Sequence, residues 1–251
     1  MNDRHFLHGG KRAFLRWLAG LGFAGALPAG WADAVREVPR SRAAEGRQKP
    51  VFGSAIELFM CGDVMTGRGI DQVLPHPGAP HLYEPYVRDA RRYVQLAEAV
   101  NGPVGGPVDF AYLWGDALEV LETLQPDVRL INLETAVTAS DETWPEKGIH
   151  YRMHPRNLPA ISAGGIHCCT LANNHVLDWG FGGLADTLEL LHRAGIATVG
   201  AGQDRNEACA PATLEVPLKG RVVVVGVGHR SSGIPRGWGA QPGDGLRCPG
   251  D

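Results

Sequence analysis

The chain has 251 residues, with 24 Lys and Arg, 27 Asp and Glu, and a formal net charge of −3. This length is enough for one large domain with a substantial apolar core. The near-neutral charge excludes a global field that would draw the chain to nucleic acid or to an anionic membrane surface, so we expect no nucleic-acid partner and infer the partner from a site.

The first 34 residues read as a signal peptide. Lys11-Arg12 precedes an apolar stretch from Trp17 to Pro28, and Ala32-Asp33-Ala34 has the small-x-small pattern of a cleavage site. The segment is similar to a twin-arginine export signal with Lys in place of the first Arg. The alternatives are a general secretory signal, an uncleaved membrane anchor and an amphipathic helix of the mature fold. We expect an exported protein of the periplasm or cell envelope.

Residues 35–54 are charged, contain Pro and lack apolar periodicity, so we expect a linker, followed by one domain over residues 55–251. Within that domain, apolar runs and turn residues predict alternating strands and helices. The expected strands are 56–61, 128–133, 166–172, 196–199 and 221–227, the last paired in a hairpin with 213–216. The expected helices are 86–100, 114–124, 155–163 and 182–194. This alternation predicts an α/β domain with a mixed sheet.

The five cysteines are an odd number, so they cannot all pair within one chain. Cys168 and Cys169 lie inside an apolar run, where we expect them to act as small buried hydrophobic residues. We expect no obligatory disulfide.

Polar donor groups follow each of the first three expected strands. They are Gly62-Asp63, then Asn132-Leu133-Glu134, then Asn173-Asn174-His175. In open α/β sheets, ligands collect where successive strands end. Carboxylates and imidazole beside an apolar sheet edge favour a divalent ion among them, and these ligand types suit Mn, Fe, Zn or Mg. The sequence therefore predicts a metal site at this edge.

Each of these residues also has a structural interpretation when taken alone. An Asp after a strand commonly forms a turn or caps a helix, a loop Glu is commonly solvated, and a lone His commonly makes a structural hydrogen bond. The run from Leu171 to Gly180 is more specific, because two amides, an imidazole and a carboxylate lie between a strand and a helix.

The ordered motifs resemble the CapA family of poly-γ-glutamate and capsule synthesis proteins. They are Cys61–Met65, Asn132–Thr135, Ala172–Gly180, Gly200–Gly202 and Ser231–Pro235. The resemblance spans residues 55–240. That family is similar in turn to calcineurin-like metallophosphoesterases, so the resemblance implies a four-layer αββα sandwich with a two-metal centre on loops at strand ends.

The resemblance also implies roles for individual residues. Asp63 would bind the first metal, Glu134 would take the place of the usual bridging Asp, and Asn174 would bind the second metal. His175 would face the substrate as a general acid or an electrostatic stabiliser. Beyond the resemblance, we infer that Asp178 orients His175 or supports the loop, since a carboxylate partner fixes the tautomer of an imidazole.

Two departures from the metallophosphoesterase pattern bear on activity. Met65 stands where the Asp-x-His motif has its histidine, and His229 is the only histidine after His192. Residues 241–251 show neither a strand nor a helix period, so we expect a truncated or frameshifted C-terminus and an incomplete sandwich.

Tyr151-Arg152, after the second motif, is a candidate for substrate contact, because Arg suits carboxylate and phosphate groups.

The sequence therefore predicts an exported CapA-like protein of capsule or poly-γ-glutamate biosynthesis with a phosphoesterase-like, metal-dependent hydrolase site. Its expected partners are an anionic surface polymer or a phosphate-ester substrate, and a membrane complex for polymer synthesis. The alternative, favoured by Met65, is a non-catalytic scaffold or polymer-binding subunit of such a complex. An intracellular phosphoesterase is a third interpretation.

Overall fold

The computed structural model describes residues 55–239. The expected leader, the expected linker and the irregular C-terminal run of residues 241–251 lie outside these residues. Within them, no helix is both long enough and apolar enough to cross a membrane.

The centre of the described fold is a four-stranded sheet in which every pair of neighbours is parallel. Its strands, in spatial order, are β1 (Leu58–Val64), β2 (Val128–Leu133), β5 (Cys168–Thr170) and β6 (Ala197–Val199). The prediction of β2 is confirmed at both ends. The expectation of one mixed sheet is wrong, because the antiparallel strands form a separate two-stranded sheet. The carboxyl ends of the four central strands consequently lie at one edge.

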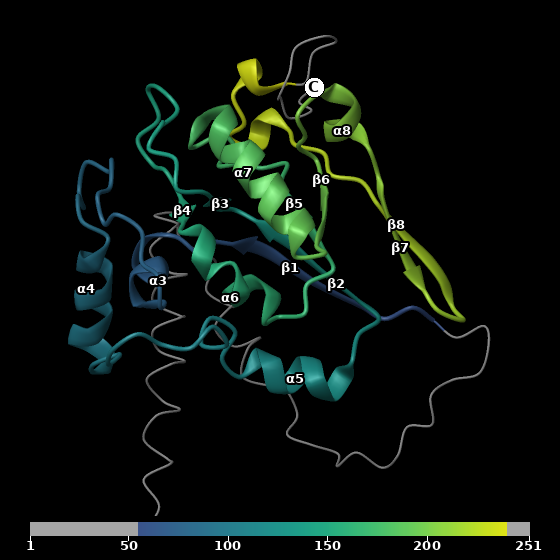
Figure 1. Ribbon diagram of the computed structural model, residues 1–251, viewed down its shortest axis with the longest axis horizontal. Coiled ribbons are helices and arrows are strands. Elements are labelled where there is room, and N and C mark those ends of the chain that lie inside the picture. Colours follow the sequence, from purple (N-terminus) through teal and green to yellow (C-terminus); the bar gives the residue numbers. More distant parts are fainter. Residues whose placement is uncertain (1–54, 240–251) are drawn as a thin grey trace, which may run out of the picture.

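The two faces of this sheet are covered differently (Figure 1). On one face, α7 (Gly180–Arg193) contributes Leu184, Leu188 and Leu191 to the core that contains Ile131 and Cys169. On the other face lies the hairpin of β7 (Ala212–Val216) and β8 (Gly220–Val224), which packs with Val128, Leu130, Cys168 and Val199. The burial predicted for the adjacent cysteines is confirmed, and the pair contributes one side chain to each face.

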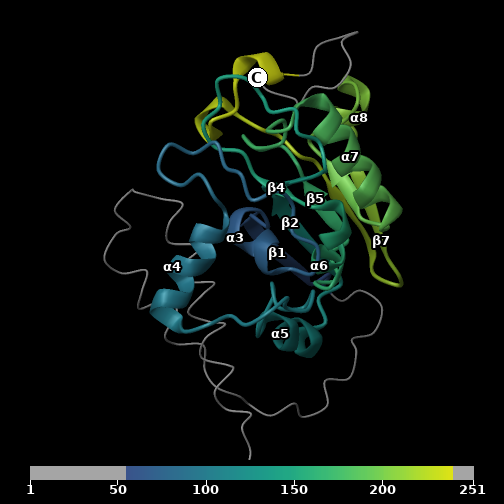
Figure 2. The same cartoon turned by 60° about the vertical axis from the view of Figure 1, so that its left-hand side comes forward.

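Further helices and a small parallel strand pair surround the sheet. They are α3 (Arg68–Val73), α4 (Arg91–Asn101), α5 (Ala117–Leu124), β3 (Ala136–Val137), β4 (Arg152–Met153), η1 (Pro155–Asn157), α6 (Pro159–Ser162), α8 (Arg205–Cys209), η2 (Arg230–Ser232) and η3 (Arg236–Trp238). Figure 2, with Figure 1, shows α3 and α4 on the β1 side of the molecule, away from the β7–β8 hairpin. The prediction of an α/β fold is confirmed.

The expected helix at 86–100 begins only at Arg91. The preceding residues form a loop closed by backbone hydrogen bonds, from Ala90 N–H to Pro80 O at 2.7 Å and from Leu82 N–H to Arg88 O at 2.9 Å. Long-range pairing therefore overrides the local helical pattern at residues 86–90. The short helix α3, which places the loop after β1, is absent from the sequence prediction.

Candidate functional site

Asp63 lies at an irregular end of β1. The pairing of β1 with β2 shifts register between Cys61 and Val64, and the backbone of Asp63 has φ 26°. A positive φ is unfavourable for a residue with a Cβ, so the surrounding structure must impose it. The Asn132 side chain, from the end of β2, donates a hydrogen bond to Asp63 Oδ1 at 2.6 Å. The carboxylate is therefore held at the junction of two strands.

An amide network joins the ends of β2 and β5. Asn132 Oδ1 accepts hydrogen bonds from Thr170 Oγ1 and Asn173 Nδ2, both at 3.1 Å. Asn173 Nδ2 also donates to Leu133 O at 3.0 Å, and its Oδ1 accepts from the His175 backbone N–H at 3.0 Å. Amides whose donors and acceptors are both satisfied in this way, here the buried Asn173 and the half-buried Asn132, are rigid connectors. The network fixes the backbone on which His175 sits.

His175 is buried and supported by an ion pair. Its Nδ1 lies 2.7 Å from Asp178 Oδ2 and 3.1 Å from Lys147 Nζ, while Lys147 Nζ lies 2.6 Å from Asp178 Oδ1. Asp178 Oδ2 also accepts from the Tyr151 backbone N–H at 2.6 Å. We assign a proton to Nδ1 in the contact with the carboxylate, which can only accept. His175 Nε2 is then the nitrogen that faces Glu134, at 3.5 Å from Oε1.

The Tyr151 ring covers one face of His175, and an arginine packs against that tyrosine. The Tyr151 ring stacks on the imidazole, with centroids 4.0 Å apart and planes 22° apart. The guanidinium of Arg68 lies 4.8 Å from the Tyr151 ring and 5.0 Å from the Tyr93 ring. Arg68 also pairs with the buried Glu84 at 2.5 Å. Its backbone, like that of Asp63, has a positive φ, of 50°. The loop after β1 thus places the buried guanidinium of Arg68 next to the cluster, on a backbone with an unfavourable positive φ.

The electrostatics of the cluster act on Glu134 and His175. Burial, and then repulsion from Asp63 and Asp178, raise the pKa of Glu134 from 4.5 to about 7. Burial lowers the pKa of His175 below its ordinary value, although the contact with Asp178 acts in the opposite direction. At neutral pH, His175 is therefore mainly neutral and Glu134 is divided between its two protonation states. Excess negative potential around Glu134 favours a proton or another cation there.

Asn174 lies at the edge of this cluster. No hydrogen-bond partner for its side-chain amide is found within residues 55–239. A Cβ built on Gly233 would lie 3.5 Å from Asn174 Cβ, so the motif from Ser231 to Pro235 packs back against the end of β5. His229 is exposed and accepts from the Ser231 backbone N–H, at the start of η2. In the described chain, its hydrogen bonds go to Ser231 and not to the cluster.

The structure thus brings four of the predicted site residues into one polar network or its immediate surroundings: Asp63, Glu134, His175 and Asp178. Sequence reasoning missed Lys147 and Arg68 as members. Lys147 lies in an irregular polar loop without a motif, so no local pattern could single it out. Arg68 stands between Gly67 and Gly69, and a Cβ on Gly67 would lie 2.9 Å from Arg152 O. The glycines on either side of Arg68 are therefore the only signal of this close packing that can be seen in the sequence around Arg68.

The donor atoms can be tested against a divalent ion. No three His, Cys, Asp or Glu side chains among residues 55–239 are grouped closely enough to hold a metal ion by themselves. Asn174 adds a side-chain amide that has no hydrogen-bond partner among the described residues. The raised pKa of Glu134 marks a place where positive charge is favoured. The mixture of carboxylate, amide and imidazole fits a hard or borderline divalent cation.

Comparisons with known proteins agree with these motifs. The chain is 52% identical over 186 residues to a "Probable polyglutamine synthesis accessory protein" of Mycobacterium tuberculosis, in strain H37Rv and in strain CDC 1551. The match covers 74% of this chain and 49% of each relative. A "Capsule biosynthesis protein CapA" of Bacillus anthracis is 25% identical over 149 residues, which cover 59% of this chain and 29% of that protein. The chain spans about half the length of the mycobacterial relatives it matches.

The family is identified over most of the described domain. The sequence model of PGA_cap, the bacterial capsule synthesis protein family, matches residues 57–246. This range contains each motif that carried the resemblance, from the end of β1 to the segment packed against Asn174. The chain therefore belongs to the PGA_cap family, the CapA-type bacterial capsule synthesis proteins.

Proposed function

We propose that this protein is an exported accessory protein of bacterial capsule or poly-γ-glutamate synthesis that carries a metal-dependent, phosphoesterase-like hydrolase site at the ends of β1, β2 and β5. Family membership supports the role in capsule or poly-γ-glutamate synthesis. One observation carries the second: His175 Nε2 faces Glu134 at 3.5 Å, and the pKa of Glu134 is raised to about 7 beside Asp63. Neutralisation of this repulsion by a bound cation would stabilise the site.

Asp63, Glu134 and Asn174 are the residues that would hold divalent metal, as Mn, Fe, Zn or Mg. When bound, such metal supplies electrophilic activation of a phosphoryl or acyl oxygen and a lowered pKa for a water nucleophile. The contribution of the protein itself lies in His175. Its Nδ1 proton is held by Asp178, so Nε2 is left as the atom that can exchange a proton with a leaving group. Tyr151 and the buried surroundings exclude water from one face of the imidazole.

The finer fold we propose is the four-layer αββα sandwich. In support, helix α7 covers one face of the central sheet, and the β7–β8 hairpin packs on the other face as a separate two-stranded sheet. We also propose export to the periplasm or cell envelope through the N-terminal segment, and work beside a membrane complex for polymer synthesis. Fusion of residues 1–40 to a reporter tests export, and retention of the fusion in the cytoplasm would reject it.

The second candidate function is a non-catalytic scaffold or polymer-binding subunit. It is favoured by Met65, which replaces the histidine of the Asp-x-His motif and whose Sδ accepts from the Gly67 backbone N–H at 3.2 Å. Metal analysis and turnover separate the two candidates. The hydrolase proposal expects at least one tightly bound transition metal per chain and Mn-stimulated cleavage of a phosphodiester, both lost in Asp63→Asn/Glu134→Gln. A folded, metal-free and inactive wild-type chain would leave the scaffold function.

A further inference from the structure

The loop that follows β1 is fixed beside Glu134 by two hydrogen bonds. The Glu134 backbone N–H donates to Val64 O at 3.0 Å, and the Thr66 backbone N–H donates to Thr135 Oγ1 at 2.9 Å. Arg68 follows two residues later, with its backbone at φ 50°. The position of Arg68 is therefore set by the same contacts that connect this loop to Glu134.

The guanidinium of Arg68 is held on three sides. Its Nε donates to Glu84 Oε1 at 2.5 Å, and the Tyr93 hydroxyl donates to Oε2 of the same carboxylate at 2.5 Å. The Tyr93 and Tyr151 ring centroids lie 5.0 Å and 4.8 Å from the guanidinium carbon. The side chains of Arg68 and Glu84 are 7% and 1% exposed. These contacts fix the plane of the guanidinium before any ligand binds.

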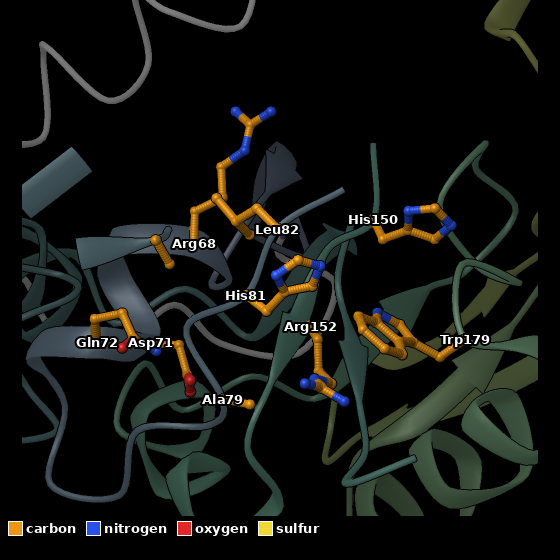
Figure 3. A pocket seen from close by; sticks show the side chains of 10 residues that line it. Arg68, Asp71, Gln72, Ala79, His81, Leu82, His150, Arg152 and Trp179 are labelled. Carbon is orange, nitrogen blue, oxygen red and sulfur yellow. The ribbon is translucent and has the colours of Figure 1, made fainter. Parts of the chain in front are cut away.

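The far end of this guanidinium remains free. Nη1 and Nη2 have no hydrogen-bond partner in the part of the chain that the structure describes, and neither nitrogen is sealed from solvent. Figure 3 shows the side chain of Arg68 extending away from Asp71, Gln72 and Arg152, which line the small pocket between α3, β4 and the start of α7. The terminal nitrogens of Arg68 are therefore open to solvent or to a bound group.

The other charged groups that line this pocket are already engaged. Asp71 accepts hydrogen bonds from the His154 backbone N–H at 2.9 Å and from the Gly78 backbone N–H at 2.7 Å. Arg152 donates from Nη1 to Asp141 Oδ1 at 2.8 Å. Arg152, which the sequence singles out for substrate contact, thus has an anionic partner at a terminal nitrogen. Within residues 55–239, neither terminal nitrogen of Arg68 has one.

Tyr151 connects Arg68 to His175. Its ring stacks on the imidazole, with centroids 4.0 Å apart, and also lies against the guanidinium. Its hydroxyl has no partner among the described residues and is not sealed from solvent. Burial has the largest effect on the pKa of Glu134 and of His175, and the positive charge of Arg68 acts to lower both. Arg68 therefore lies within electrostatic reach of both groups.

The two free nitrogens form a fork that fits two oxygens of a carboxylate or of a phosphoryl group. A carboxylate would use both of its oxygens on the fork. A phosphoryl group keeps a further oxygen, which can face Glu134 and His175. A purely structural pairing with Glu84 accounts for Nε and leaves the fork unused. The arrangement therefore favours a tetrahedral oxyanion.

We propose that Nη1 and Nη2 of Arg68, together with the Tyr151 hydroxyl, bind the oxygens of a tetrahedral oxyanion beside Glu134 and His175. The oxyanion site stands on the contacts of Arg68 and Tyr151, whereas its use for the phosphoryl group of a hydrolase substrate rests on the proposed function. In that use, Arg68 orients the phosphoryl group and offsets part of its negative charge.

Calorimetric titration of the full chain with inorganic phosphate, in EDTA, tests the oxyanion site without metal. The parent protein is Asp63→Asn/Glu134→Gln, which lacks two carboxylates that would hold metal and repel the anion. Arg68→Lys in this parent keeps a positive charge for Glu84 and removes the fork. Arg68→Gln/Glu84→Gln removes both buried charges together, so neither is left without its partner.

Two further variants of the same parent complete the set. Tyr151→Phe removes the hydroxyl and keeps the ring that stacks on His175. Arg156→Gln, which changes an exposed arginine on η1, is the matched control. Acetate serves as a second probe, because it offers a planar carboxylate in place of a tetrahedral anion.

We expect the parent to bind phosphate, and Arg68→Lys to weaken binding about tenfold or more, because an ammonium cannot reproduce two charged hydrogen bonds in one plane. Tyr151→Phe should weaken it about threefold or more. Arg156→Gln should change it less than about twofold. Acetate should bind about tenfold more weakly than phosphate or worse.

No binding of phosphate by the parent would overturn the site, and so would unchanged affinity in folded Arg68→Lys and Arg68→Gln/Glu84→Gln. Acetate that binds as tightly as phosphate would overturn the tetrahedral assignment. A chain that binds phosphate through Arg68 but holds no metal as wild type would reject the hydrolase proposal and leave the oxyanion site. Metal-dependent cleavage with the same kcat and KM in wild type and Arg68→Lys would reject only the role of Arg68.

Discussion

Asp178 Oδ2 and His175 Nδ1 lie 2.7 Å apart in the turn between β5 and α7, and Asp178 is fully buried. The same carboxylate binds the ammonium of Lys147 and the backbone of Tyr151. One buried charge therefore holds together the loop that bears Lys147, the segment that leads into β4, and the imidazole.

Replacement of Asp178 by Asn should destabilise the protein by about 2–4 kcal/mol, because it leaves the largely buried Lys147 ammonium without its counter-charge. Urea unfolding followed by circular dichroism measures the change. Glu189→Gln is the control. It removes an exposed partner of Arg193 within α7 and should change stability by less than about 0.5 kcal/mol. Equal effects of the two substitutions would contradict the role given to Asp178.

The stability of the metal-free protein should fall as pH rises from about 4.5 to about 7. The pKa of Glu134 is raised from 4.5 to about 7 in the folded state, so the folded chain binds more protons than the unfolded chain in this window. Below 4.5 the contribution is fully present, and above 7 it is lost.

Glu134→Gln, which cannot ionise, isolates this contribution. We measure the free energy of unfolding by urea titration in EDTA. The value for Glu134→Gln should match that of the wild type near pH 4.5 and exceed it by about 1–3 kcal/mol at pH 8. A difference between the two proteins that does not vary with pH would show that Glu134 is not destabilised by its charged neighbours.

Addition of Mn²⁺ or Zn²⁺ should raise the melting temperature of the wild type. A ligand at 100 times its dissociation constant adds about 2.7 kcal/mol to stability when it binds only the folded state. Asp63→Asn/Glu134→Gln should lose this increment. The control Glu119→Gln/Glu122→Gln removes two exposed carboxylates from α5 and should retain it. A metal-induced shift that persists in Asp63→Asn/Glu134→Gln would place the ion elsewhere.

Gly200→Ala should destabilise the fold by about 2–4 kcal/mol. Gly200 has φ +84°, and a Cβ there would lie 2.6 Å from Ala172 Cβ. Gly195→Ala is the matched comparison, since Gly195 has φ +74° but open space around its Cβ position. That change should cost only the backbone strain, about 1 kcal/mol. The difference, measured by thermal unfolding, isolates the close approach of β6 to the end of β5.

The strands and the position of the site follow from the sequence to a considerable extent. Apolar runs bounded by turn residues located β2 at its observed ends, and the polar groups after β1, β2 and β5 do meet at one sheet edge. The predicted start of α4 was wrong, because the backbone bridge between residues 80–82 and 88–90 depends on long-range packing. Lys147 and Arg68 were missed for a related reason: their importance depends on partners 31 and 16 residues away, Asp178 and Glu84, and no periodicity marks such contacts.

The β7–β8 hairpin has a consequence for the behaviour of the protein in solution. Its inner face packs on the sheet, whereas Val223 on β8 is exposed, as are Val225 and Val227 in the segment that follows β8, and Val227 is 75% exposed. Met60, on β1, is 70% exposed beside the covered part of the sheet. Apolar rows next to strand edges promote intermolecular pairing. Self-association should therefore grow with concentration, and Val223→Thr/Val225→Thr should suppress it while the hairpin register is retained.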